Sequence, residues 1–191
     1  MQALVEAGLP VAAVISNRAD ATGLDFARAK GIAARVVEHR AFGERADFEA
    51  ALRREIDRFA PRLVALAGFM RVLTPAFVTH YRDRLLNIHP SLLPAFAGLE
   101  THARALAAGV KVHGCTVHFV TGELDSGPIV IQAALPVRPG EAADALAARV
   151  LGQEHIIYPR AARWFLDERL VIENGVVRVK GNDAQLVMAA D

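Results

Sequence analysis

The chain has 191 residues, of which 53% are hydrophobic and 23% charged, and its formal net charge at pH 7 is +1. This length suits one domain with a substantial core, and the balanced charge offers no electrostatic footprint for nucleic acid. Cys115 is the only cysteine, so no internal disulfide can form, as expected for a reducing cytoplasm. No apolar run reaches the roughly 18 residues of a membrane span, and no signal-peptide pattern is present. We expect one soluble cytoplasmic domain over residues 1–191.

Strands and helices are predicted to alternate through the first half of the chain. Continuous apolar runs predict buried strands at residues 11–15, 34–38, 63–67 and 85–89. Helical spacing and stop signals predict helices at residues 1–7, 22–30, 44–59 and 74–80. This alternation predicts an α/β, Rossmann-like fold, with a mostly parallel sheet and helices on both faces.

The second half has longer predicted elements. Strands are expected at residues 112–120 and 129–137, and a short helix at residues 101–108. Residues 141–169 have a helical pattern that Pro159 should break or kink. Asn174-Gly175 between two apolar runs predicts a β-hairpin. Residues 181–191 have the character of a tail.

The strand predicted at residues 85–89 carries two polar side chains near its end. Side chains alternate along a strand, so Asn87 and His89 point to the same face. Ligands in open α/β sheets bind beyond such strand ends. A single histidine there can also be purely structural, and the strand alone does not decide between these readings.

Ordered motifs extend over nearly the whole chain. They are Ala-Gly-Phe-Met-Arg at 67–71, Asn-Ile-His-Pro-Ser-Leu-Leu-Pro at 87–94, Gly-Leu-Glu-Thr-His at 98–102, His-Gly at 113–114, Val-His-Phe-Val at 117–120, Glu-Leu-Asp-Ser-Gly-Pro at 123–128, Gln-Glu-His at 153–155 and Tyr-Pro at 158–159. Together they resemble the formyltransferase family that uses formyl-tetrahydrofolate. The resemblance implies the Rossmann-like formyltransferase fold of that family.

The resemblance also implies a reaction. The expected donor, used as a co-substrate, is 10-formyltetrahydrofolate, and the expected acceptor is the amine of 5′-phosphoribosylglycinamide (GAR), in purine biosynthesis. No metal is implied, and the expected partners are these small molecules, acting on a monomer or homodimer without nucleic acid or membrane. The alternatives are relatives that formylate methionyl-tRNA or hydrolyse formyltetrahydrofolate, and a non-catalytic folate-binding module. Near-neutral charge argues against a tRNA substrate.

Formyl transfer to an amine passes through a tetrahedral oxyanion, which needs hydrogen-bond donors and a group that moves protons. The resemblance matches Asn87, His89 and Asp125 to the catalytic residues of the family. Asn87 offers an amide donor, His89 a charged donor when protonated, and Asp125 a carboxylate that favours an imidazolium. By composition alone, the Asp-Ser-Gly-Pro segment that contains Asp125 is typical of a structural turn.

The substrate-binding residues are likewise implied by the resemblance. The folate-binding set is Met70, Arg71, Val72, Leu73, Asn87, Thr121, Gly122, Glu123, Leu124 and Asp125. Arg45 and Glu154 match residues that contact GAR. From the residues themselves, Met70-Arg71 could be a plain connection between a strand and a helix, and Arg45 could belong to a solvated helix face.

The beginning of the chain departs from the family. In the family, a strand and a loop rich in Gly, Ser and Asn precede the helix that matches residues 1–7, and that loop binds the phosphate of GAR. We therefore expect a shortened version of a longer protein that binds GAR poorly. The strands at residues 11–15 and 63–67 should then remain unpaired with each other, across a slot of roughly 9.5 Å.

Overall fold

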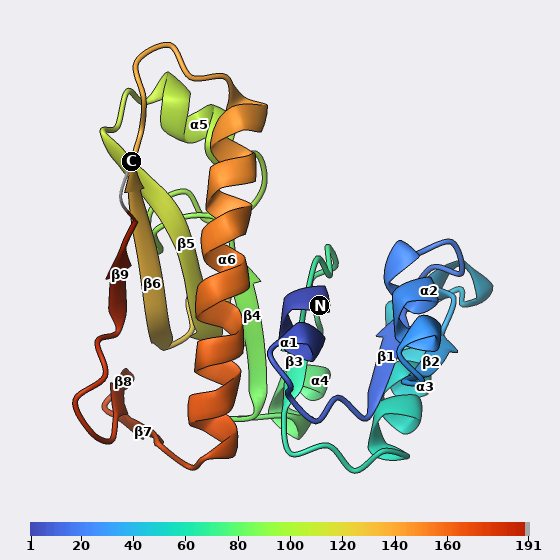
Figure 1. Cartoon of the computed structure of the whole chain (residues 1–191). Coiled ribbons are helices and arrows are strands. Elements are labelled where there is room, and N and C mark those ends of the chain that lie inside the picture. The colour runs from blue at the N-terminus through green and yellow to red at the C-terminus, as the bar shows by residue number, and fades with distance from the viewer. Residues whose placement is uncertain (190–191) are drawn as a thin grey trace.

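The computed structural model describes residues 1–189, in which helices and strands alternate as predicted (Figure 1). The first elements are α1 (Gln2–Glu6), β1 (Ala13–Ser16), α2 (Thr22–Ala29), β2 (Ala33–Val36), a 3-10 turn (His39–Ala41), α3 (Arg45–Asp57), β3 (Val64–Leu66), α4 (Pro75–His80) and β4 (Leu85–His89). The others are α5 (Thr101–Ala107), β5 (Val112–Phe119), β6 (Ile129–Pro136), α6 (Ala143–Leu166), β7 (Leu170–Glu173), β8 (Val176–Val179) and β9 (Leu186–Met188). None of these helices is long and apolar enough to cross a bilayer.

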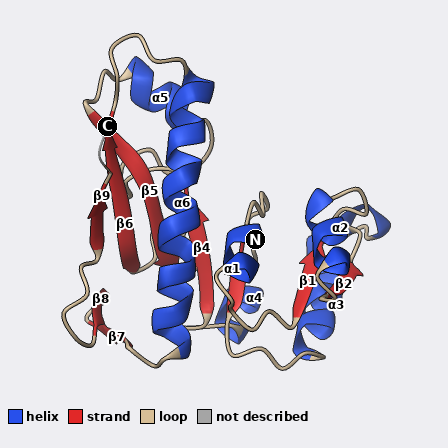
Figure 2. Cartoon of the chain, in the orientation of Figure 1, coloured by secondary structure: helices blue, strands red, loops and turns tan. Residues whose placement is uncertain are grey.

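Five strands form the main sheet, in the order β3-β4-β5-β6-β9 (Figure 2). β3 and β4 are parallel, β5 runs antiparallel to both β4 and β6, and β9 is parallel to β6. β1 and β2 form a separate parallel pair. The predicted α/β, Rossmann-like class is confirmed, and the reversal of β5 is what brings a second strand alongside the end of β4.

Both faces of β4 are covered by helices. Leu86 packs in a core cluster with Ile157 of α6, which lies across the sheet in Figure 1. Leu85, on the opposite face, packs with Phe48 of α3 and Phe77 of α4. Because side chains alternate, Asn87 and His89 share the face of Leu85. The strand that carries them is therefore fixed from two sides.

A cleft separates the two parallel strand pairs. Within residues 1–189, β1 pairs only with β2, and β3 pairs only with β4. A cavity of about 780 Å³ lies between β1 and β3, with walls that include Val14 and Ala65 and with Leu4 and Ala162 among its other lining residues. The expectation that the two strands do not pair with each other is confirmed.

Pro159 lies inside the long C-terminal helix without breaking it, so of the predicted break or kink the break is wrong. α6 runs without a gap from Ala143 to Leu166, with Pro159 inside it. Ile157, Tyr158 and Pro159 are all buried. A proline removes one helical hydrogen bond, but packing of the helix against the sheet outweighs that local cost.

The segment predicted as a tail contributes a strand. Leu186–Met188 pairs with β6, with Val187 beside Ala133, and so forms the edge strand of the main sheet opposite β3. Residues 190–191 of that predicted tail lie outside the described residues. The Asn174-Gly175 hairpin is confirmed: β7 and β8 are antiparallel, and the two turn residues have φ of 51° and 78°, respectively.

Candidate active site

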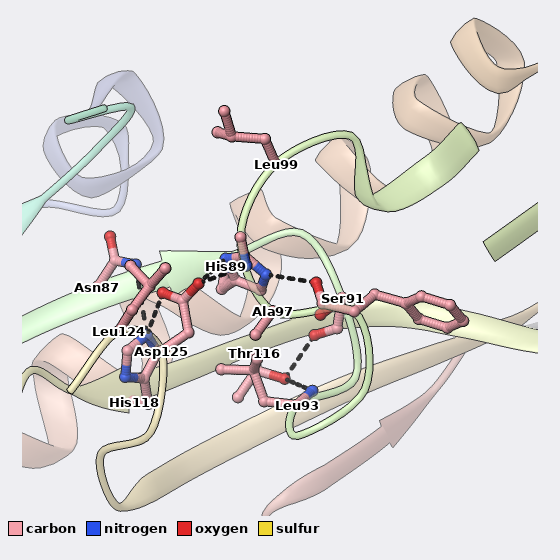
Figure 3. A network of polar contacts seen from close by, with 12 residues as sticks. Asn87, His89, Ser91, Leu93, Ala97, Leu99, Thr116, His118, Leu124 and Asp125 are labelled. Atoms are coloured by element: carbon pink, nitrogen blue, oxygen red, sulfur yellow. Dashed lines mark hydrogen bonds and ion pairs between the residues drawn. The ribbon is translucent and has the colours of Figure 1, made fainter. Parts of the chain in front are cut away.

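The pairing of β4 with β5 assembles a polar cluster at one end of the sheet (Figure 3). In the antiparallel register, Asn87 lies opposite His118 and His89 lies opposite Thr116. Directly opposed residues bring their side chains together on one face of a sheet. Asn87, His89 and His118 therefore face the same region, and Asp125 reaches it from the loop after β5.

His89 has an acceptor at each ring nitrogen. Its Nδ1 lies 3.4 Å from Oδ2 of Asp125, and its Nε2 donates to the carbonyl oxygen of Phe96 at 3.1 Å. The His89 side chain is buried, at 6% exposure. An imidazolium here donates to both acceptors, whereas a neutral ring satisfies only one of them.

Asp125 occupies a strained turn position. Its φ is 51°, in the left-handed region, and its Oδ2 accepts a hydrogen bond from the backbone N–H of Gly98 at 2.9 Å. Gly127, two residues on, lies so close to Phe119 that an added Cβ would be 1.8 Å from its carbonyl oxygen. The turn reading and the catalytic reading of this segment are therefore compatible: the tight turn is what aims the carboxylate at His89.

His118 orients the amide of Asn87. The Nδ1–H of His118 donates to the carbonyl oxygen of Phe119 at 2.9 Å, which leaves Nε2 as an acceptor. Nε2 lies 3.4 Å from Nδ2 of Asn87. Burial lowers the pKa of His118, although the Phe119 carbonyl and the Asp125 charge oppose the shift. A neutral His118 thus holds one amide hydrogen of Asn87 and leaves the other for a ligand.

Thr116 and Gln132 hold the loop that supplies the Phe96 carbonyl. The Thr116 hydroxyl donates to the carbonyl oxygen of Ser91 at 2.6 Å and accepts from the backbone N–H of Leu93 at 3.0 Å. Nε2 of Gln132 donates to the carbonyl oxygen of Leu93 at 2.9 Å. Sequence reasoning missed these residues. Gln132 has a signal, because it is the one polar residue in β6, whereas Thr116 shares β5 with His113 and His118.

The predicted folate segments are mostly exposed. Met70 and Val72 are 74% and 55% exposed, whereas Leu73 is buried in the cluster of α3 and α4. Arg71 is also exposed, and its guanidinium carbon lies 5.5 Å from the ring centroid of Phe48. In the loop before Asp125, Thr121 is half-buried, while Gly122, Glu123 and Leu124 are exposed.

The two predicted GAR contacts lie outside this cluster. Arg45 is exposed in the first turn of α3, and no hydrogen bond or ion pair is found for it within residues 1–189. Glu154 is half-buried on α6; burial raises its pKa, an effect that the nearby amino group of Met1 opposes. Within the described part of the chain, no group of three or more His, Cys, Asp or Glu residues is arranged to hold a metal ion.

The described geometry agrees with comparisons to known proteins. A family model described as formyl transferase matches residues 2–162. The chain belongs to the formyl transferase family. This formyl transferase is 52% identical to phosphoribosylglycinamide formyltransferase of Escherichia coli K12, over 90% of this chain and 81% of that protein.

Solved structures agree with this assignment. A phosphoribosylglycinamide formyltransferase from Coxiella burnetii superposes with a TM-score of 0.90 at 48% identity, covering 94% of this chain and 87% of that one. A formyltetrahydrofolate deformylase from Burkholderia mallei gives a TM-score of 0.81 at 30% identity, covering 91% and 60%. Since both share the fold of this formyl transferase, the fold by itself does not separate transfer from hydrolysis.

Proposed function

We propose that this formyl transferase moves the formyl group of 10-formyltetrahydrofolate to the amine of GAR, a step of purine biosynthesis. The observation that carries the proposal is the contact of the buried His89 with the nearly buried Asp125: Nδ1 of His89 lies 3.4 Å from Oδ2 of Asp125, on the same face as Asn87. This arrangement offers both the donors and the proton acceptor that formyl transfer to an amine requires.

The proposed chemistry balances with these three groups. The amine nitrogen attacks the formyl carbon, a new C–N bond forms, and the carbonyl oxygen becomes an oxyanion. The Asn87 amide donates a hydrogen bond to that oxygen, and the His89 imidazolium, whose two N–H groups are held by Asp125 and the Phe96 carbonyl, places a positive charge beside it. Asp125 accepts the proton that the amine loses. The oxyanion then re-forms the carbonyl as the bond from the formyl carbon to N10 of the folate breaks. N10 takes the proton that Asp125 had accepted, and formyl-GAR and tetrahydrofolate leave.

The residues that contact substrates form the second part of the proposal. We propose that the folate is bound by two segments, Met70–Leu73 and Thr121–Asp125, together with Asn87. Arg45 and Glu154 are proposed to bind GAR: the guanidinium suits the phosphate, and the carboxylate suits the ribose hydroxyls. We further propose a cytoplasmic monomer or homodimer that uses small molecules only. The free, buried thiol of Cys115 suits a reducing compartment.

One assay separates this function from its rivals. Release of tetrahydrofolate from 10-formyltetrahydrofolate is measured with GAR, without GAR, and with methionyl-tRNA in place of GAR, and formyl-GAR is detected by mass spectrometry. We expect release only with GAR. Release without any amine would identify a hydrolase, release with methionyl-tRNA a tRNA formyltransferase, and folate binding without release a non-catalytic module.

The cleft between β1 and β3 leads to a proposal about GAR affinity. β1 and β4 both point upward in Figure 1, and β3 is parallel to β4, so the two cleft walls run in the same direction. Each wall has one edge without a partner strand within residues 1–189. We propose that one extended apolar segment, parallel to both walls, fits there and pairs with each. GAR affinity should rise when that cleft is filled, because β1 and the elements beyond it are poorly supported.

A further inference from the structure

Glu49 is a buried charged residue that lies outside the catalytic cluster. It belongs to α3, and its side chain is only 4% exposed. A buried carboxylate is unfavourable unless hydrogen bonds compensate for its lost hydration. The donors that provide this compensation indicate what Glu49 does.

Both carboxylate oxygens of Glu49 are bound to Thr74. They accept from the backbone N–H of Thr74 at 3.0 Å and 3.1 Å, and the Thr74 hydroxyl donates to the same carboxylate. The Thr74 oxygen in turn accepts from the backbone N–H of Phe77 and so caps α4. Glu49 therefore fixes both the backbone and the side chain of the residue that directly follows the Met70–Leu73 segment.

Two further contacts attach the same segment to α3. The guanidinium of Arg71 stacks over the ring of Phe48, the neighbour of Glu49, and Leu73 is buried in the cluster that contains Phe48. Met70, just before these anchors, and Val72, between them, are 74% and 55% exposed. The segment is thus held by alternate residues, and its other side chains are left open to a ligand.

We propose that Glu49 is a positioning residue for the reduced folate: through Thr74 it fixes the Met70–Leu73 segment in the shape that binds the donor. This inference rests on the proposed function of that segment. Glu49 does not touch the reacting atoms, so its loss should weaken folate binding and leave the chemical step intact.

The test compares Glu49→Gln with Asp57→Asn in the full chain. Asp57 also joins α3 to α4, but at the other end of α4: it accepts from the hydroxyl of Tyr81 at 2.9 Å and from Nε2 of His80 at 3.0 Å. For Glu49→Gln we expect the KM for 10-formyltetrahydrofolate to rise about tenfold, with kcat and the KM for GAR within about twofold. For Asp57→Asn we expect all three constants to stay within about twofold.

Thr74→Ala provides a second variant if Glu49→Gln folds poorly. It removes the hydroxyl bond to Glu49, so it should raise the same KM, and the double variant should show less than the product of the two single effects. An unchanged folate KM in folded Glu49→Gln and Thr74→Ala overturns the proposal. An equal rise in Asp57→Asn also overturns it, because the effect would then reflect general loosening of α4.

Failure of the underlying function gives a different result. Calorimetric titration of the wild-type chain with 10-formyltetrahydrofolate, in the absence of GAR, measures donor binding directly. If the wild type does not bind the donor, the proposed function fails and the role of Glu49 fails with it. If the wild type binds the donor and the Glu49 and Thr74 variants bind it equally well, only the positioning role fails.

Discussion

The strands on the two sides of the cleft differ in how completely they are buried. In β5, every residue from His113 to Phe119 is buried, and β4 and β6 also carry several buried residues. In β1, all four residues are only partly buried, and in β2 two of the four are exposed. The centre of the main sheet, from β4 to β6, is thus well buried, whereas β3 and the β1–β2 pair line an open cleft and are only partly buried.

This difference suggests that turnover depends on the main sheet and that GAR affinity depends on the β1–β2 side of the cleft. The contacts described for Asn87, His89 and Asp125 all come from residues between β4 and β6, among them Phe96, Gly98 and His118. Arg45, the proposed phosphate contact, begins α3 and follows the β1–β2 pair in the chain. The proposed catalytic groups are therefore held in place by the main sheet, while GAR affinity should depend on the less supported side.

The largest expected effect is a loss of turnover when one of the three proposed catalytic residues is replaced. Replacement of His89 or Asp125 by alanine should lower kcat about 100-fold or more, because a charged donor or the proton acceptor is lost from the transition state. Asn87→Ala should do likewise with little change in folate affinity. Steady-state kinetics of purified variants measure these effects.

Ser126→Ala is the matched control for that loop. Ser126 is exposed and donates to the carbonyl oxygen of Leu124, next to Asp125, without touching the carboxylate. Its kcat should stay within about twofold of the wild type. Retention of turnover within threefold in any of the three alanine variants would show that the catalytic assignment is wrong.

The second prediction is that filling the cleft stabilises the less buried β1–β2 side. A peptide of about six β-branched apolar residues, flanked by lysines for solubility, should fill the cleft. Because it supplies backbone partners to both walls, it should raise the Tm by about 5 °C and lower the KM for GAR about tenfold. Amide hydrogen exchange at Ala13–Ser16 and Val64–Leu66 should slow on binding.

The control peptide has the same composition plus a central proline, which cannot donate to a neighbouring strand. It should change neither the Tm nor the exchange rates. If both peptides act alike, or if neither alters exchange at the cleft walls, strand addition in the cleft is refuted. The kcat should stay within about twofold throughout, because the catalytic groups lie on the main sheet.

The features that depend on local backbone rules were predicted correctly from the sequence. Alternation along one strand was enough to place Asn87 and His89 together, and turn chemistry was enough for the Asn174-Gly175 hairpin. The break at Pro159 and the tail at residues 186–188 were predicted wrongly because packing decides both: α6 stays helical against the sheet, and Leu186–Met188 pairs with β6.

The approach of Asp125 to His89 could not be derived from local rules. The two residues lie on separate loops and strands, and their contact depends on the reversal of β5 and on the left-handed φ of Asp125. Only the family resemblance pointed to it. The acceptor role of the Phe96 carbonyl was likewise hidden, since any residue type can offer a carbonyl oxygen.

The third prediction uses acid to weaken the main sheet. Burial, followed by the charges of His102 and His89, lowers the pKa of His113 to about 4, from 6.5 in an unfolded chain. Between these values the unfolded chain binds more protons than the folded one, so the free energy of unfolding falls as the pH falls from 6.5 towards 4. For His113 alone the loss is about 3 kcal/mol.

Urea unfolding at pH 7.5, 6.5, 5.5 and 4.5 measures this loss. In His113→Gln, which cannot titrate, the unfolding free energy should fall less over the same range. Glu154, whose pKa burial raises, contributes a slope of opposite sign in both proteins and cancels from the difference. Identical pH slopes in the two proteins would show that His113 is protonated equally in the folded and unfolded chains.

The smallest expected effect concerns β3, the strand at the edge of the main sheet. The hydroxyl of Tyr158, on α6, lies 2.7 Å from the carbonyl oxygen of Leu66 and 3.1 Å from that of Leu86. It therefore attaches the cleft wall to the helix that covers the main sheet. Tyr158→Phe removes this buried donor and should cost about 1–2 kcal/mol, a fall in Tm of roughly 4 °C.

Tyr81→Phe is the control for that variant, because the Tyr81 hydroxyl donates to Asp57, which keeps His80 as a second donor. Its Tm should fall by less. In Tyr158→Phe, hydrogen exchange should quicken at Val64–Leu66 more than in β5, because β3 has a neighbouring strand on one side only within the described chain. The filling peptide should then restore part of the lost Tm, since it supports β3 from the opposite edge. An equal Tm loss with and without the peptide would mean that the peptide and Tyr158 stabilise β3 independently of each other. That result would contradict the expected coupling between the cleft and α6 through β3.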